Sequence, residues 1–292
     1  MKKKYKLTEE TINVNGKSLY RIEALRDFSD VKKGDKGGFI ENEDNLSHDG
    51  NCWVYGNAMV YDHAKVRSNA KVYGNAKIFC CAEIYDDAIV HGYTKVYGNA
   101  KVFGKANVYG NAKVRGNANV FDNAKVYGNA LVHGNANVYG NANVFDYAEV
   151  YGNAWVHGNA NVYGYAGVCG DATVCGNAMV YGTAEVFDNA NIYGDANVFD
   201  KAKVYGYAGV CGDATITSDS DYIIFKNWWS SGRFFTWTKS NNMWKVGCFY
   251  GSGRELIEKA YKDSELSGRE YKRVVDYVES VLKEMLNNIN EN

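Results

Sequence analysis

The chain has 292 residues, of which 46% are hydrophobic and 23% charged, and its formal net charge is −1. A balanced charge gives no overall basic excess for nucleic acid and no acidic excess for nucleic-acid mimicry. No apolar run approaches the roughly 18 residues that span a bilayer. The start, Met1-Lys-Lys-Lys-Tyr, lacks the apolar core of a signal peptide. We therefore predict a cytoplasmic protein that neither crosses nor binds a membrane, with reduced cysteines.

Residues 1–53 are predicted to form an N-terminal cap. The segment 11–22 alternates polar and apolar residues around Asn15-Gly16. This dipeptide is typical of a tight hairpin turn. A glycine-rich bend follows at residues 33–40, and it does not match the spacing of a phosphate-binding loop. Because a stack of strands has an exposed edge, the expected role of this segment is to cover that edge.

Residues 54–217 contain one repeat of six residues. An aliphatic residue recurs at every sixth position from Val54 to Ile216, and a small residue follows each by four positions. Thr94 is the single substitution for alanine in that second series. A strict period of six matches neither a helix nor a plain strand, and it is typical of a solenoid whose turns stack equivalent residues.

The residue types predict the shape of each turn. Ala58 and Val60 are two apart, so their side chains share one side of a short strand and fill a narrow interior. Gly or Asp followed by Asn is typical of a corner, since Gly and Asn tolerate positive φ at low cost. Three sides of six residues close a triangle, which gives about nine coils and a prism roughly 43 Å long.

This repeat resembles the left-handed parallel β-helix of the hexapeptide-repeat superfamily. The unit reads Val-Tyr-Gly-Asn-Ala-Lys at residues 72–77, whereas that superfamily usually places glycine directly after the aliphatic residue. Many members are trimeric acyltransferases with a histidine as general base beside a loop that interrupts the coils. The resemblance thus implies the handedness of the helix and makes a coenzyme A-dependent acyltransferase an alternative function.

Residues 218–292 are predicted to form a small α+β domain. Three strands are expected at 222–225, 233–238 and 243–249, followed by helices from 252 to about 262 and from 268 to 286. In the second helix an apolar stripe includes Tyr271, Val275 and Val278. Four of the six tryptophans lie in this segment. The predicted fold is therefore mainly β: a cap, a parallel β-helix and a C-terminal α+β domain.

Two sets of residues are candidates for binding a partner. Residues 18 apart stack in the predicted prism, and one corner carries an aromatic series that suits a partner as well as a purely structural role. The C-terminal segment holds Trp and Arg, the types enriched at interface hot spots, although some must be core. The candidates are Tyr73, His91, Tyr109, Tyr127, Trp228, Trp229, Arg233, Trp237 and Trp244.

The sequence supports catalytic residues less strongly than partner-binding residues. His91, His133 and His157 occupy the aromatic position of the repeat, which indicates variants of a corner ring instead of placed bases. His48 and His63 are the other histidines. No cysteines show zinc spacing. We therefore predict no catalytic residue, metal or cofactor and favour a non-enzymatic protein.

Charge is distributed unevenly along the repeat. Residues 54–125 carry ten Lys or Arg against five Asp or Glu, whereas residues 126–216 carry two against eight. The net charges are therefore +5 and −6. This dipole is explained by compositional drift, by antiparallel self-association, or by a bipolar surface for another partner.

The whole chain resembles hexapeptide-repeat "polymer-forming" proteins encoded by bacteriophages and prophages. The resemblance covers the opening at residues 21–41, the Val-Tyr-Gly-Asn-Ala array and the Val-Gly-Cys-Phe-Tyr-Gly ending at residues 246–251. It implies a phage or prophage source. Together with the long repetitive surface and the lack of a catalytic constellation, this source predicts a homo-oligomer in the host cytoplasm that binds a bacterial host protein or a small nucleotide signal, with inhibition of a defence system as its use. A structural component of the virion is a further alternative.

Overall fold

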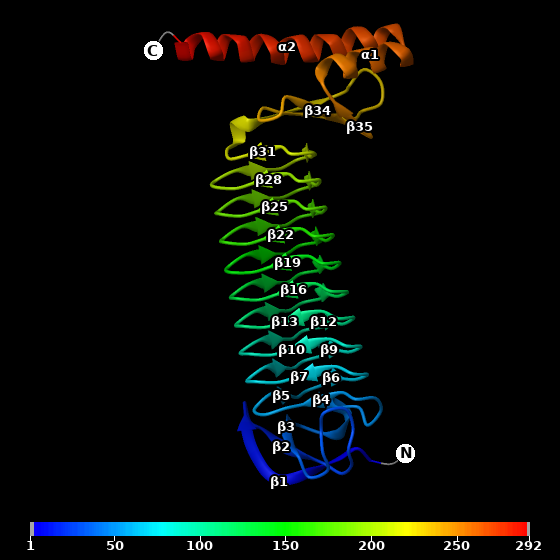
Figure 1. The fold of residues 1–292 in the computed structure, drawn as a ribbon, viewed down its shortest axis with the longest axis vertical. Helices are drawn as coiled ribbons and strands as arrows, with labels where there is room; N and C mark the ends of the chain where they lie inside the picture. Colours follow the sequence, from blue (N-terminus) through cyan, green and yellow to red (C-terminus); the bar gives the residue numbers. More distant parts are fainter. Residues whose placement is uncertain (1–2, 291–292) are drawn as a thin grey trace.

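The computed structural model describes residues 3–290 of the chain, and side chains up to residue 284. It is a straight prism of stacked coils with a β-rich cap at the N-terminal end and two helices across the C-terminal end (Figure 1). The predicted mainly β architecture, a parallel β-helix followed by an α+β region, is confirmed.

The N-terminal cap is a hairpin joined to the first coils. Strands β1 (Tyr5–Val14) and β2 (Lys17–Ala24) pair antiparallel, and the turn between them has positive φ at both Asn15 and Gly16. Strand β3 (Lys36–Ile40) pairs antiparallel with β2 and parallel with β5 (Met59–Val60). The short 3-10 helix η1 (Glu43–Asn45) follows. The cap therefore continues one sheet of the prism and pairs its first strand.

The prism is built from two-residue strands that begin every six residues. They run from β4 (Trp53–Val54) through β5 to β31 (Thr215–Ile216). Every third strand pairs in parallel, which gives three sheets. We call these sheets face A (β5 to β29, together with β1–β3), face B (β4 to β31) and face C (β6, Lys65–Val66, to β30, Gly209–Val210). The six-residue period is thus the length of one side of the triangle.

The interior is filled by the two residues that the repeat holds constant. The aliphatic residues from Val54 to Ile216 and the alanines between them are at most 1% exposed. Thr94, the single departure, is also buried, and its hydroxyl donates to the carbonyl of His91 at 2.6 Å. A buried hydroxyl is therefore tolerated because it has a backbone acceptor within its own turn.

Each corner turns at one residue with positive φ. That residue is Gly at most corners and Asp, Ser or Cys at the others, for example Gly92 at +75° and Asp122 at +57°. The Asn that follows in the repeat does not have positive φ. The expectation that both residues serve the corner through left-handed backbone is therefore wrong for Asn, which makes side-chain bonds instead.

The C-terminal module has four strands and two helices. The 3-10 helix η2 (Asp219–Asp221) leads into β32 (Tyr222–Lys226), β33 (Phe234–Thr238), β34 (Met243–Val246) and β35 (Phe249–Gly251), an antiparallel sheet in chain order. The third predicted strand is in fact two, because Gly247 turns the chain at φ +54°. Helix α1 (Gly253–Asp263) is followed by α2 (Glu265–Asn290), which begins three residues earlier than predicted.

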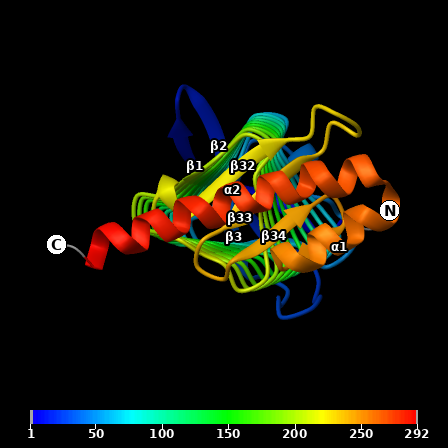
Figure 2. The same ribbon diagram turned by 90° about the horizontal axis from the view of Figure 1, so that it is seen from above.

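The module lies on the last coils of the prism. The Gly209 amide donates to the Thr236 hydroxyl at 2.8 Å, and the rings of Tyr207 and Phe234 stack at 4.3 Å. Seen along the axis, the coils superimpose in a triangular outline, α2 crosses it, and the β1–β2 hairpin stands outside it (Figure 2). None of the helices within residues 3–290 is long and apolar enough to cross a bilayer.

Candidate functional site

The predicted aromatic ladder forms along one corner of the prism. From Tyr73 to Phe199, consecutive rings 18 residues apart lie nearly parallel with centroids 4.5–5.1 Å apart. Tyr55 at the first coil meets Tyr73 edge-on instead, at 6.4 Å. Of the four ladder candidates, Tyr73 is 36% exposed, and His91, Tyr109 and Tyr127 are half-buried by their neighbours. Each ring thus covers the next, and the ladder exposes ring edges.

The tryptophan candidates separate into core and surface. Trp237 and Trp244 pair across β33 and β34 and are each 2% exposed, so they belong to the module's core. The prediction that these two residues contact a partner is therefore wrong. Trp229 is half-buried, with its ring 6.1 Å from that of Tyr271. Trp228 is 83% exposed beside it, and Arg233 is exposed at the end of the same loop. Trp237 and Trp244 lie inside predicted strands, whereas Trp228 and Trp229 lie in the polar segment between two of them, and this difference is the sequence signal that separates the roles.

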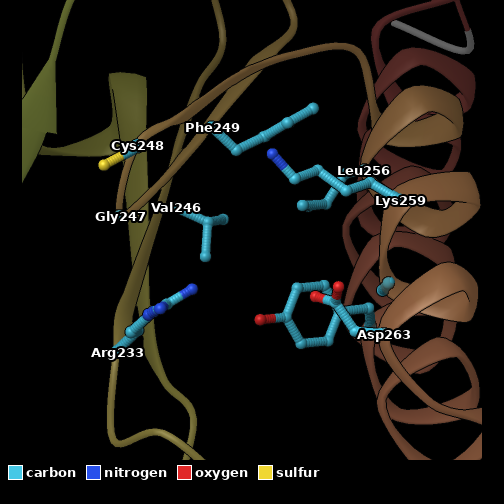
Figure 3. A pocket seen from close by; sticks show the side chains of 10 residues that line it. Arg233, Val246, Gly247, Cys248, Phe249, Leu256, Lys259 and Asp263 are labelled. Atoms are coloured by element: carbon cyan, nitrogen blue, oxygen red, sulfur yellow. The ribbon is translucent and has the colours of Figure 1, made fainter.

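A hollow of about 170 Å³ lies between the module's sheet and helix α1. Arg233 extends into it from the sheet side, and Lys259 and Asp263 extend into it from the helix, whereas Cys248 points away (Figure 3). Phe249 forms an apolar part of the wall. Two cationic side chains and one carboxylate therefore line the same small space.

Arg233 and Lys259 are positioned by neighbouring residues of the sheet and by the start of helix α1. The Arg233 side chain runs over Gly247, where a Cβ would lie 3.4 Å from its Cδ. The Lys259 ammonium lies 5.6 Å from the centre of the Phe249 ring. Helix α1 begins with a capping box, in which Ser252 accepts from the Glu255 amide and Glu255 accepts from the Ser252 amide. Lys259 and Asp263 are four residues apart on this helix and so share one face.

Face A carries a row of outward residues, in which the 18-residue spacing of Lys77, Lys95 and Lys113 already predicts that these lysines stack. The order of the row along the prism is Met59, Lys77, Lys95, Lys113, Leu131, Glu149, Gly167, Glu185 and Lys203. Two surface hollows lie on it. One, of about 490 Å³, is lined by the three lysines and Tyr93. The other, of about 520 Å³, is lined by Glu149, Gly167, Glu185 and three tyrosines. The stacking of the three lysines follows from their spacing, whereas the two hollows depend on the tyrosines at the edge of the face.

The histidines of the repeat are part of the ring ladders. His91 stacks between Tyr73 and Tyr109, and His157 stacks on Tyr139 at 4.7 Å. Burial lowers the pKa of both imidazoles below the usual 6.5. His133 differs: its Nε2 lies 2.8 Å from a carboxylate oxygen of Glu149 while its ring stacks on Tyr151. A histidine held by a carboxylate is an arrangement found in general bases. His133 and Glu149 are 16 residues apart in the sequence, so no local motif indicated this pair.

Asparagines at the corners form amide ladders. Asn99, Asn117 and Asn135 each donate to the next side chain 18 residues on, and Asn153 donates to Asp171 at 2.9 Å. A second ladder starts at Asn141 and ends at Asp195. These bonds link successive coils, so the asparagines have a structural role.

The comparisons with known proteins give one partial match. A segment is 39% identical over 61 residues to "Uncharacterized acetyltransferase YdcK" of Escherichia coli (strain K12), and it covers 18% of this chain and 19% of the relative. No family model matches the chain. The match and the stacked coils fit the hexapeptide-repeat β-helix superfamily.

Proposed function

We propose that the chain is a non-enzymatic binding protein of phage or prophage origin that captures a bacterial host factor through its C-terminal module. The observation that carries this proposal is the hollow lined by Arg233 and Lys259, with the exposed Trp228 on the same module. Two cations and the single carboxylate of Asp263 leave one positive charge in excess, which favours an acidic side chain or a phosphate. An exposed tryptophan elsewhere on the same module supplies apolar contact area of the kind that dominates interfaces.

In this proposal the prism has no catalytic role and serves as a rigid support for the module. Its coils run without an inserted loop from Val54 to Ile216, so they hold the module at a fixed distance from the cap. The host factor is either an acidic protein surface or a small nucleotide signal, since both present anionic groups. Blocking a host defence component is the use that we propose for this capture.

Native mass spectrometry of the tagged protein from expressing bacteria tests this function. We expect the wild-type chain to carry an added protein, or a ligand on the order of several hundred daltons for a nucleotide. Arg233→Ala/Lys259→Ala and, separately, Trp228→Ala should lose at least about 90% of the added mass. Arg254→Ala is the matched control, because Arg254 is an exposed cation on α1 that pairs with Glu258 outside the hollow.

Two results would count against capture by the module. A bare chain from bacteria would remove its main support. A bound species that all the variants retain equally would place the binding surface elsewhere.

A second candidate is acyl transfer from coenzyme A, favoured by the His133–Glu149 pair and the partial acetyltransferase match. In it, Glu149 would orient the imidazole that takes a proton from an acceptor. Turnover of acetyl-coenzyme A that His133→Ala abolishes and His157→Ala leaves intact would establish this candidate.

A further inference from the structure

We propose that face A binds a second copy of this chain, with the two prisms antiparallel and related by a two-fold axis at Leu131. The row on face A has a symmetric pattern about this residue. Lys113 and Glu149 are the strand neighbours of Leu131 on its two sides. Further out, Lys77 and Glu185 are each three strands away from it. Opposite charges therefore lie at equal distances from one apolar residue.

Two strands from Leu131, a charged residue on one side corresponds to open space on the other. Lys95 and Gly167 are each two strands from Leu131. A Cβ built on Gly167 would meet nothing within 4 Å, and the hollow around it is lined by Glu149 and Glu185. In an antiparallel pair, Lys95 of one copy enters this hollow of the other, between two carboxylates and beside tyrosine rings. Each copy supplies one lysine and one hollow, as a two-fold interface requires.

The edge of face A follows the same symmetry. A two-fold axis parallel to the strands reverses the prism but keeps the same edge on the same side. Tyr93 and Tyr165 lie on that edge, two coils before and two coils after Asn129, and they are 66% and 67% exposed. In the dimer, Tyr93 of each copy would lie against Tyr165 of the other copy. Two exposed rings are thus covered by the arrangement that pairs the charges.

The isolated chain leaves the lysines uncompensated. Lys77, Lys95 and Lys113 are direct neighbours on adjacent parallel strands, where like charges destabilise a sheet. Within the described residues none of them forms an ion pair with a carboxylate. Parallel docking would place lysines on lysines. Antiparallel docking compensates them, over a strip roughly 29 Å long from Lys77 to Glu185 at the usual strand spacing.

Charge reversal on face A tests this dimer. Sedimentation at low salt should show a dimer of the full chain, weakened at least about tenfold at high salt by screening. Lys77→Glu/Lys95→Glu/Lys113→Glu should be monomeric, and so should Glu149→Lys/Glu185→Lys. Mixed together, the two variants should form a heterodimer, because each reversed half then faces an opposite charge. Recovery in the mixture also shows that both variants are folded.

The matched control makes the same change of net charge on other surfaces. Lys101, Lys105 and Lys125 belong to the same half of the prism, but they lie off face A and are exposed. Their triple change to Glu should leave the dimer intact. A monomeric wild-type chain, a trimer, or equal dissociation of the control would overturn the proposal.

The position of the axis has its own test. With the exposed Cys81 and Cys248 changed to Ser, Leu131→Cys should be joined to its own copy by a short bismaleimide. Lys125→Cys, on face B, should not be. The reverse pattern would place the contact on another face. This inference concerns a surface separate from the C-terminal hollow, so either proposal can fail while the other stands.

Discussion

At the residue scale, each corner depends on one residue with left-handed backbone, which is glycine at most corners. Gly92 has φ +75°, and a Cβ built there would lie 2.7 Å from the carbonyl oxygen of Gly110 in the next coil. Asp146, at the same corner three coils further on, also has positive φ. Both residue types adopt the turn, but glycine does so without the cost of roughly 1–2 kcal/mol that an L-residue bears in left-handed backbone.

Gly92→Ala is expected to lower the melting temperature of the protein. The methyl group adds left-handed strain and a contact with the backbone of the next coil, which cannot rotate away. Gly56→Ala is the control, since it has positive φ but its Cβ would meet nothing closer than 3.9 Å. Thermal unfolding followed by circular dichroism should show the larger loss for Gly92→Ala. Equal losses would mean that the backbone contact is unimportant.

At the element scale, the aromatic ladder is a stack in which each ring has two neighbours. A charged ring in such a stack loses solvation on both faces. This accounts for the lowered pKa of His91, which lies between Tyr73 and Tyr109. Because the folded-state pKa is below that of the unfolded chain, the unfolded state takes up the proton first as the pH falls. The ladder is therefore most stable above pH 6.5 and is weakened below it.

His91→Phe should reduce this sensitivity to acid. Melting temperatures at about pH 7.5 and about pH 5.5 should differ less in the variant than in the wild type, by on the order of 1–2 °C for a half-exposed group. His63→Phe is the control, because His63 is exposed and outside the ladder. An unchanged difference in His91→Phe would show that protonation of His91 does not affect the stack.

The ladder and the coils could be predicted because a six-residue period fixes which side chains stack. Val72 and Val90 must pair once three sides close a coil, and they do. The C-terminal module has no such period. Gly247, which ends β34, and the pairing of Trp237 with Trp244 depend on tertiary packing. The row through Leu131 follows from the same 18-residue spacing, whereas the C-terminal hollow depends on how the module's sheet and helices pack.

At the scale of the whole molecule, the prism is a one-dimensional stack in which each coil contacts only its neighbours. Its stability is then close to a sum of equal increments. The cap completes one end through β3 and β5, and the module covers the other through the bond between Gly209 and Thr236. Length is consequently a property that can change without changing the fold, provided both ends remain.

Deleting residues 108–125 should give a folded prism that is shorter by one coil. The deletion joins Asn107 to Val126, so the alternation of outward and inward residues is preserved. We expect an unchanged circular dichroism spectrum and a particle about 4.8 Å shorter in small-angle scattering. Cooperative loss of the β signal would contradict the triangular stack.

The amide ladders give this stack a direction. In each, an Asn side chain donates toward the C-terminal end and accepts from the coil before it, and the last acceptor is Asp171 or Asp195. A carboxylate accepts but cannot donate when ionised, so it ends the chain of hydrogen bonds. Coils that look interchangeable in the sequence therefore have a fixed order. Moving the coil with Asp171 toward the N-terminus would divide the hydrogen-bonded ladder into two shorter ladders.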